Sequence, residues 1–241
     1  MLRNVYVVAF FVGFITVGCA RPPAAPGATA VYMVEHETDF EPTRTRMIVT
    51  PEFLRIDDGR DGDDFLLYHR GERTIYNVSA SDALILVISP QPVGAAPMAL
   101  EHRVESESDN LPDVGGKKVR HYRLLTNRAL CYDLYAADGL LPEVVTALRE
   151  YRESLAGEHA QALAFTPQEM QTPCDLANNI YAPARHLAHG FPVRLAETNG
   201  RDGKRVRTTE LLDYRQGFAA DAALFRLPGY RRMTLEELRR R

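Results

Sequence analysis

Short runs in which apolar and polar residues alternate fill much of this 241-residue chain. In Phe53-Leu54-Arg55-Ile56-Asp57, for example, polar side chains occupy alternate positions, which predicts a strand with one buried and one solvent-facing side. Turn residues separate successive runs at intervals of about eight to twelve residues, a spacing typical of an antiparallel meander. The first runs expected to form strands cover residues 31–38, 45–50, 52–57, 65–69, 74–79 and 83–88.

A helical pattern replaces this alternation in the middle of the chain. Pro142 and Glu143 suit a helix N-terminus, because proline costs no hydrogen bond there and a carboxylate favours the positive end of the helix dipole. Apolar residues then recur at spacings of three and four, which predicts a helix with one buried side. These residues are Val144, Val145, Leu148, Tyr151 and Leu155, and His159 continues the series.

A second helix is predicted by the capping-box pair Thr166 and Glu169; it would contain Cys174 and continue towards Ile180. Residues 184–189 predict one more short turn. We therefore expect a helical insertion over residues 141–189 within a single β domain that spans residues 30–241. An insertion of about 50 residues with one cross-link has too thin a core to form a separate domain.

Further strands are expected on both sides of this insertion, at residues 98–104, 119–126 and 130–136 before it and at residues 190–198 and 205–214 after it. Asn199-Gly200 and Asp202-Gly203 separate the last two and supply the positive φ of tight turns, so these strands should form a hairpin.

The chain ends in a predicted short helix. Thr234 and Glu237 form its capping box, and we expect Met233, Leu235 and Leu238 to pack on the sheet. Arginines at positions 231, 232 and 239–241 flank these residues, so an anionic membrane surface is the alternative contact for this end.

The first 18 residues have the pattern of an export signal: one arginine, Arg3, and then an apolar run over residues 5–17 that is short for a membrane span. Thr16-Val17-Gly18-Cys19 follows, and a small residue directly before a cysteine resembles the bacterial lipobox, although lipoboxes favour Leu where Thr16 stands. We expect a signal peptide over residues 1–18, a lipid on Cys19 and a Pro/Ala-rich tether over residues 19–29. A plain signal peptide or a signal anchor is the alternative.

The lipobox pattern also predicts a location. Acyl chains on Cys19 would bind a membrane with about 0.8 kcal/mol per buried CH₂ group. Ala20, rather than Asp, after the lipid cysteine favours the periplasmic side of the outer membrane if the cell is Gram-negative. The net charge of −3 gives no electrostatic argument for a nucleic-acid partner.

Two cysteines remain in a chain expected to reach an oxidising compartment. A disulfide between Cys131 and Cys174 would close a loop of about 44 residues and contribute about 4 kcal/mol. Neither cysteine has the CxxC or nearby histidine of a metal pair, and two separate buried thiols are the other alternative.

Other candidate sites are weaker. The acidic stretch 57–64 places Gly59 and Tyr68 where a calcium loop needs its third and twelfth ligands, so Asp57, Asp64 and the acidic residues between them are expected in a solvated hairpin loop. His186 and His189 could share a helix face as metal ligands, but interaction with the carbonyls of a helix end is the favoured interpretation.

The sequence contains no GxSxG elbow, no phosphate-binding loop and no dinucleotide fingerprint. We therefore expect neither an enzyme nor a cofactor. A hydrolase whose catalytic residues lie far apart in the sequence remains the alternative, because a long-range triad leaves no local pattern.

One resemblance adds to this picture. Residues 190–194, the strand with Thr208 and Glu210, and the segment 224–230 resemble the ending of envelope proteins related to the lipoprotein-localisation-factor superfamily, which includes the carriers that sort lipoproteins to the outer membrane. The resemblance implies a strongly curved antiparallel sheet, a half-barrel with helices packed on or plugging its concave face. Those carriers are not lipidated, whereas this chain is expected to be, so the resemblance does not assign it the carrier function. The pattern that matches is a folding pattern, so it identifies no ligand-contacting residue.

These observations lead to three functional hypotheses. The first is a lipid-anchored, non-enzymatic envelope protein that binds an apolar ligand or a lipidated partner on the concave sheet. The second is a structural or protein-interaction lipoprotein with a solid core, and the third is an envelope hydrolase.

Overall fold

The computed structural model describes residues 27–240 except 63, 108–110, 164 and 168–169. The predicted export signal, Cys19 and most of the tether therefore lie outside the described residues. Among the described residues, no helix combines the length and apolar character that a membrane span requires.

The described residues form one twelve-stranded open sheet in the order β12-β6-β5-β4-β3-β2-β1-β11-β10-β9-β8-β7. All neighbouring strands are antiparallel except β12, which runs parallel to β6. The strands are β1 (Ala28–Glu37), β2 (Thr43–Val49), β3 (Phe53–Asp57), β4 (Phe65–His69), β5 (Thr74–Ser79), β6 (Leu84–Ile88), β7 (His102–Glu107), β8 (Val119–Thr126), β9 (Ala129–Ala137), β10 (Phe191–Thr198), β11 (Arg205–Phe218) and β12 (Arg231–Thr234).

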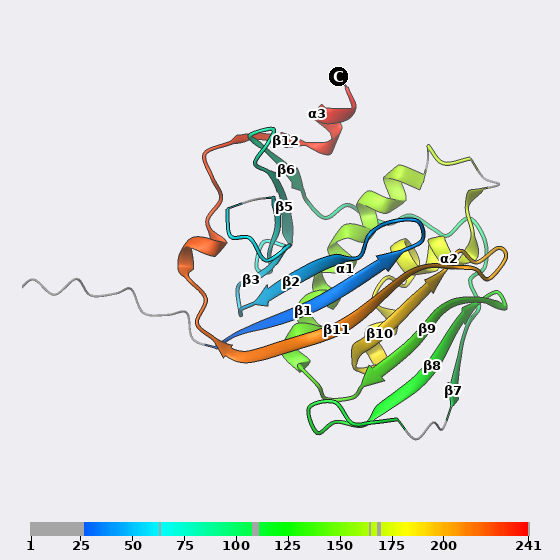
Figure 1. Cartoon of the computed structure of the whole chain (residues 1–241). Coiled ribbons are helices and arrows are strands. Elements are labelled where there is room, and N and C mark those ends of the chain that lie inside the picture. Colours follow the sequence, from blue (N-terminus) through cyan, green and yellow to red (C-terminus); the bar gives the residue numbers. More distant parts are fainter. Residues whose placement is uncertain (1–26, 63, 108–110, 164, 168–169, 241) are drawn as a thin grey trace, which may run out of the picture.

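The sheet is strongly curved, and helix α1 (Pro142–Leu163) lies in its hollow, behind β1 and β2 in Figure 1. Register shifts interrupt the central pairings, between Tyr32 and Met33 on β1 and between Pro192 and Arg194 on β10. Such bulges bend a strand and increase its twist. The sequence-based expectation of a mainly β fold with helices on a concave sheet is confirmed.

Alternation along the strands supplies the core between α1 and the sheet. Val31 and Met47 point to the helix, where Val144 and Ala147 have no exposed surface. Polar atoms in this layer have partners: the Tyr68 hydroxyl lies 3.0 Å from the Ser154 hydroxyl. The predicted apolar side of the helix is therefore the side that is buried.

The outer face of β3–β6 is covered by the segment that follows β11, which contains the 3-10 helix η4 (Ala222–Phe225). Phe225 stacks on Phe53 with ring centroids 5.4 Å apart. Arg55, only 1% exposed, donates to the Leu224 carbonyl at 2.7 Å and to Asp57 at 2.5 Å. Figure 1 shows this segment running along the edge of the molecule to β12 and α3 (Leu235–Arg239).

Residues 89–101 connect β6 to β7 and pass over α1. A Cβ at Gly157 would lie 2.0 Å from the Gln91 carbonyl oxygen, so helix and connection touch where only glycine fits. The Tyr181 hydroxyl donates to the Ala95 carbonyl at 3.1 Å and holds the connection to the next helical segment.

Several boundaries differ from the predictions. The strand expected at residues 98–104 is β7, four residues later at its start. The helix expected from Thr166 is α2 (Pro173–Leu176), with Thr172 as its N-cap, and the π-helix η2 (Ala177–Tyr181) continues it. Thr172 accepts from the Asp175 N–H, and proline at the first position ends the preceding extended chain there. Glu169 lies outside the described residues.

The C-terminal prediction is partly correct. The capping box of Thr234 and Glu237 is present, and Met233 is buried. Leu238, however, is 43% exposed and does not pack on the sheet as expected, because β12 places only Met233 against the covered side. Arg239 and Arg240 instead pair with Glu158 and Glu236.

Candidate functional site

A pocket of about 270 Å³ lies between the concave side of the sheet and the helices that cover it. This volume is near the lower end for ligand pockets, roughly 300–1,000 Å³. The sheet contributes Met33, Glu35, Thr45, Met47, Ile56, Phe191, Pro192, Leu195 and Thr209. The helices contribute Leu148, Tyr151, Arg152, His186 and Leu187.

Most of these side chains are apolar, and two are methionines, whose flexible thioethers adapt to irregular apolar ligands. The three contributions from α1 have the spacing i, i+3, i+4, so they project from one side of the helix. A second hollow of about 350 Å³, on β1, β2 and β11, is lined mainly by charged and polar groups such as Arg44, Asp213 and Arg215. Only the first hollow has the mainly apolar lining of a site for an apolar ligand.

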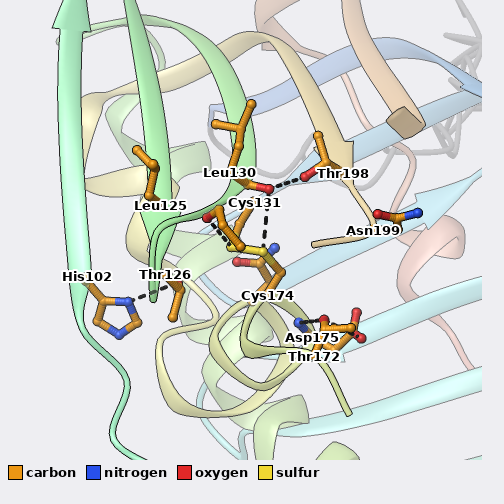
Figure 2. Close-up of a disulfide and its surroundings, with 12 residues drawn as sticks. His102, Leu125, Thr126, Leu130, Cys131, Thr172, Cys174, Asp175, Thr198 and Asn199 are labelled. Carbon is orange, nitrogen blue, oxygen red and sulfur yellow. Dashed lines mark hydrogen bonds between the residues drawn. A yellow bond between two sulfur atoms is a disulfide. The ribbon is translucent and has the colours of Figure 1, made fainter. Parts of the chain in front are cut away.

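The helical segments beside this pocket are held by the predicted disulfide, which is confirmed. Cys131 on β9 and Cys174 on α2 are joined, with their Cα atoms 5.2 Å apart (Figure 2). Thr198 donates to the Leu130 carbonyl next to the disulfide. Gly200, in the predicted hairpin turn, has φ +67° and would place a Cβ 2.9 Å from the Cys174 sulfur. Turn and disulfide therefore pack directly against each other.

Arg185 holds the next segment, the 3-10 helix η3 (Arg185–His189). Its guanidinium donates to the Thr126 hydroxyl at 2.7 Å, to the Leu125 carbonyl at 3.2 Å and to the Asn178 side chain at 2.9 Å. Burial lowers the pKa of Arg185. These bonds join η3 to β8 and η2, and so fix His186 at the pocket.

His186 and His189 do not form a shared site as a metal pair would. His186 packs against Tyr132 with ring centroids 5.1 Å apart, whereas His189 stacks on Tyr122 at 4.4 Å. Burial lowers the pKa of both, and that of His186 lies well below its usual value. Both histidines lie in the last turn of η3, and their rings pack against aromatic side chains of β8 and β9.

A charged cluster lies beside the pocket on β1, β10 and β11. Arg207 contacts Glu197 at 3.1 Å, Glu35 at 3.6 Å and Glu37 at 3.7 Å. Although burial acts in the opposite direction, these carboxylates raise the pKa of Arg207. The three carboxylates therefore form ion pairs with Arg207 on the sheet.

Residues 58–64 connect β3 to β4, as expected. Asp57, in contrast, is the last residue of β3, and its carboxylate is buried against arginine rather than solvated as expected. Asp57 binds Arg46 at 2.8 Å, Asp58 pairs with Arg60, and Asp61 contacts Arg46 at 2.6 Å. Among the described residues, no group of three or more acidic, His or Cys side chains is arranged to hold a metal.

One further polar cluster lies on the other face of β8 and β9. His121 Nε2 is 2.7 Å from Asp133, its Nδ1 is 3.3 Å from Glu107, and its ring stacks on Tyr135 at 4.4 Å. These contacts place two carboxylates on one imidazole and join β7, β8 and β9.

Sequence reasoning did not find Arg152 or His186 as pocket residues. The three- and four-residue spacing predicted the buried side of α1. Because Arg152 directly follows Tyr151, a member of that series, the position of Arg152 beside the buried side could be predicted from the sequence. The opposing residues come from strands that lie about 40 to 120 positions away in the sequence, and no local pattern indicates that contact.

No family model matches this chain, and no curated protein is significantly similar to it in sequence. Among solved structures, an uncharacterised conserved protein from Thermus thermophilus aligns with a TM-score of 0.47 and 12% identity, over 86% of this chain and 90% of that one. PNGF-II aligns with a TM-score of 0.42 and 9% identity, over 88% of this chain but 32% of that one. A LolA superfamily protein from Nitrosomonas europaea aligns at 0.28 and 10%, over 81% and 87%. The resemblance expected from the sequence thus corresponds to a weak structural likeness, and none of these scores supports a functional argument.

Proposed function

We propose that this chain is a lipid-anchored protein of the bacterial envelope that binds an apolar ligand, or the apolar group of a lipidated partner, between its curved sheet and α1. The observation that carries the proposal is the mainly apolar pocket of about 270 Å³ beneath the helix. Burial of apolar surface contributes about 25 cal/mol per Å², so an acyl chain gains most by entering such a pocket.

The anchor in this proposal rests on the sequence. Cys19 follows an export signal, and residues 20–27, the part of the predicted Pro/Ala-rich tether that precedes β1, separate it from the sheet. A tether of this composition is extended, which would leave the pocket free to reach a ligand near the membrane. We propose the periplasmic side of the outer membrane as its location.

We further propose that binding, rather than catalysis, is the activity. The pocket is lined by Thr45, Thr209 and His186, but the His186 ring packs against Tyr132 and its Nδ1 has no hydrogen-bond partner among the described residues. This arrangement differs from the nucleophile, base and orienting acid of a hydrolase.

The ligand proposal is tested by purifying the full-length protein from its membrane and analysing it by native mass spectrometry and organic extraction. We expect an acyl compound to co-purify with the wild type. Thr209→Trp, which fills the pocket from β11, should lose it, whereas Val206→Trp, at an exposed position on the same strand, should retain it. A wild-type protein without any extractable apolar compound would contradict the proposal.

The anchor is tested separately by metabolic labelling with a palmitate analogue. The wild type should incorporate the label and fractionate with membranes, and Cys19→Ala should do neither. Incorporation into the Cys19→Ala variant would show that another residue carries the lipid.

A protein-interaction role is the second candidate, and one observation favours it. Phe165 is 78% exposed and Met170 56% exposed in the connection that follows α1, where large apolar side chains would be stable against a partner. Replacing both with Ser should then abolish a cross-linked complex in cells while leaving ligand binding unchanged. Unchanged cross-linking would eliminate this candidate.

A further inference from the structure

Arg152 is the positively charged member of the pocket lining, and it is partly buried on α1. Within the part of the chain that the structure describes, its guanidinium makes no hydrogen bond and no ion pair. A guanidinium has five N–H donors, and at a partly buried position an anionic group of a ligand can replace the water that these donors would otherwise bind. Arg152 therefore lines the pocket as a cation for which the described part of the folded chain supplies no acceptor.

The other charges around the pocket do not supply this acceptor. Glu35 also lines the pocket, but its carboxylate lies 3.6 Å from Arg207 on the neighbouring strand. His186 is only 2% exposed, its Nδ1 has no hydrogen-bond partner among the described residues, and burial together with the charge of Arg152 lowers its pKa far below the usual value. The helix side of the pocket thus combines the Arg152 cation with a buried imidazole that has an unpaired nitrogen.

The chemistry of this arrangement matches an amphiphile. A planar guanidinium binds a carboxylate through two parallel hydrogen bonds, which are among the strongest in proteins. The residues opposite Arg152 on the sheet are largely apolar, with Met33, Met47 and Leu195 buried. A ligand with an anionic head and a single apolar chain satisfies both sides at once.

We propose that the pocket takes a single-chain amphiphile with a carboxylate head group, a fatty acid, whose carboxylate pairs with Arg152 while its chain lies against the methionines of β1 and β2. This inference rests on the proposed function, since it assigns a ligand class to the same pocket. It makes Arg152 a specificity-determining residue.

Laurate and dodecanol test the inference, because they share a twelve-carbon chain and differ in the charged head. Binding of each is measured by native mass spectrometry on the delipidated full-length protein, for the wild type, Arg152→Gln, Arg152→Lys and Arg120→Gln. Arg120 is exposed on β8, outside the pocket lining, and serves as the control for loss of one positive charge. Circular dichroism establishes that each variant is folded.

We expect Arg152→Gln to weaken laurate binding roughly tenfold to a hundredfold, the value of a charged hydrogen-bonded pair. Dodecanol binding should change less than about twofold, as expected for a contact that does not involve charge. Arg152→Lys should keep the preference for laurate, and Arg120→Gln should match the wild type. If both ligands bind and Arg152→Gln affects them equally, the carboxylate assignment is overturned while the proposed apolar-ligand function stands. If neither ligand binds the wild type, the proposed function fails and this inference fails with it.

Discussion

Replacing Cys131 and Cys174 together with Ala should lower the free energy of unfolding by about 4 kcal/mol or slightly more. The disulfide spans a sequence separation of 43 residues, and it joins the start of β9 to α2. In the chain-entropy model, opening a loop of about 44 residues restores that much free energy to the unfolded state. Both side chains are buried, at 0% and 1% exposure, so the lost sulfur atoms add a cavity cost in the same direction.

Urea unfolding of the full-length protein, followed by far-ultraviolet circular dichroism, measures this difference. A reducing agent gives the internal control: it should destabilise the wild type by about 4 kcal/mol and leave the double variant unchanged. Because α2 and η3 follow the disulfide, the double variant should also lose bound ligand more readily.

A difference below about 1 kcal/mol between wild type and double variant, with the wild-type disulfide verified by mass spectrometry, would refute this reasoning. It would mean that Arg185 and the packing of Tyr132 already confine the helical segments in the reduced chain.

The remaining predictions concern packing and charge. Gly157→Ala should destabilise the protein by roughly 1–3 kcal/mol despite the better helix propensity of Ala, because the new Cβ would meet the Gln91 carbonyl. Gly94→Ala, on the connection that contains Gln91, has open space and should leave the stability unchanged; thermal unfolding compares the two variants. Asp57→Asn should cost about 3–5 kcal/mol, because Arg55 would remain buried without its carboxylate, and chemical denaturation measures this loss. Burial raises the pKa of Asp57, but its arginine partners lower it further, so the folded value lies below the ordinary 3.8. Its stabilising contribution is therefore present above that value and is lost as the pH falls through the folded pKa. Acid titration should show this loss in the wild type, and an equally steep loss in Asp57→Asn would contradict it.

Most of the sheet was predictable because its strands alternate and end at turn residues. Strands β4, β5 and β8 have the predicted bounds, and the hairpin of β10 and β11 follows from its Asn-Gly and Asp-Gly turns. Strand β12 was missed because it is four residues long and contains one apolar residue, Met233. Its pairing with β6 joins segments about 150 positions apart, and local sequence does not encode that contact.

The helical segments show the limit of local signals. Thr166 and Glu169 have the spacing of a capping box, but the helix that contains Cys174 begins at Pro173, behind the N-cap Thr172. Thr172-Pro173-Cys174-Asp175 is an equally good N-terminal pattern for a helix, with a capping threonine before a proline. The disulfide to β9 holds Cys174 within this first turn.

The pocket was predictable only as a consequence of the fold. The sequence favoured a hollow sheet with a helix in it, yet the pocket lining combines β1, β2, β3, β10 and β11 with α1 and η3. Arg152 is a candidate ligand-binding residue because it lines the pocket and has no acceptor among the described residues. Both properties depend on the fold, and the local sequence does not indicate them.

Photolabelling can locate an apolar ligand between α1 and the concave sheet. A fatty-acid probe with a photoreactive diazirine near the end of its chain is irradiated with the full-length protein, and the labelled residues are mapped by tandem mass spectrometry. We predict labelling of Leu148, Tyr151 or Phe191, reduced by excess laurate. Labelling confined to the outer face around Phe225, or insensitive to laurate, would contradict the account.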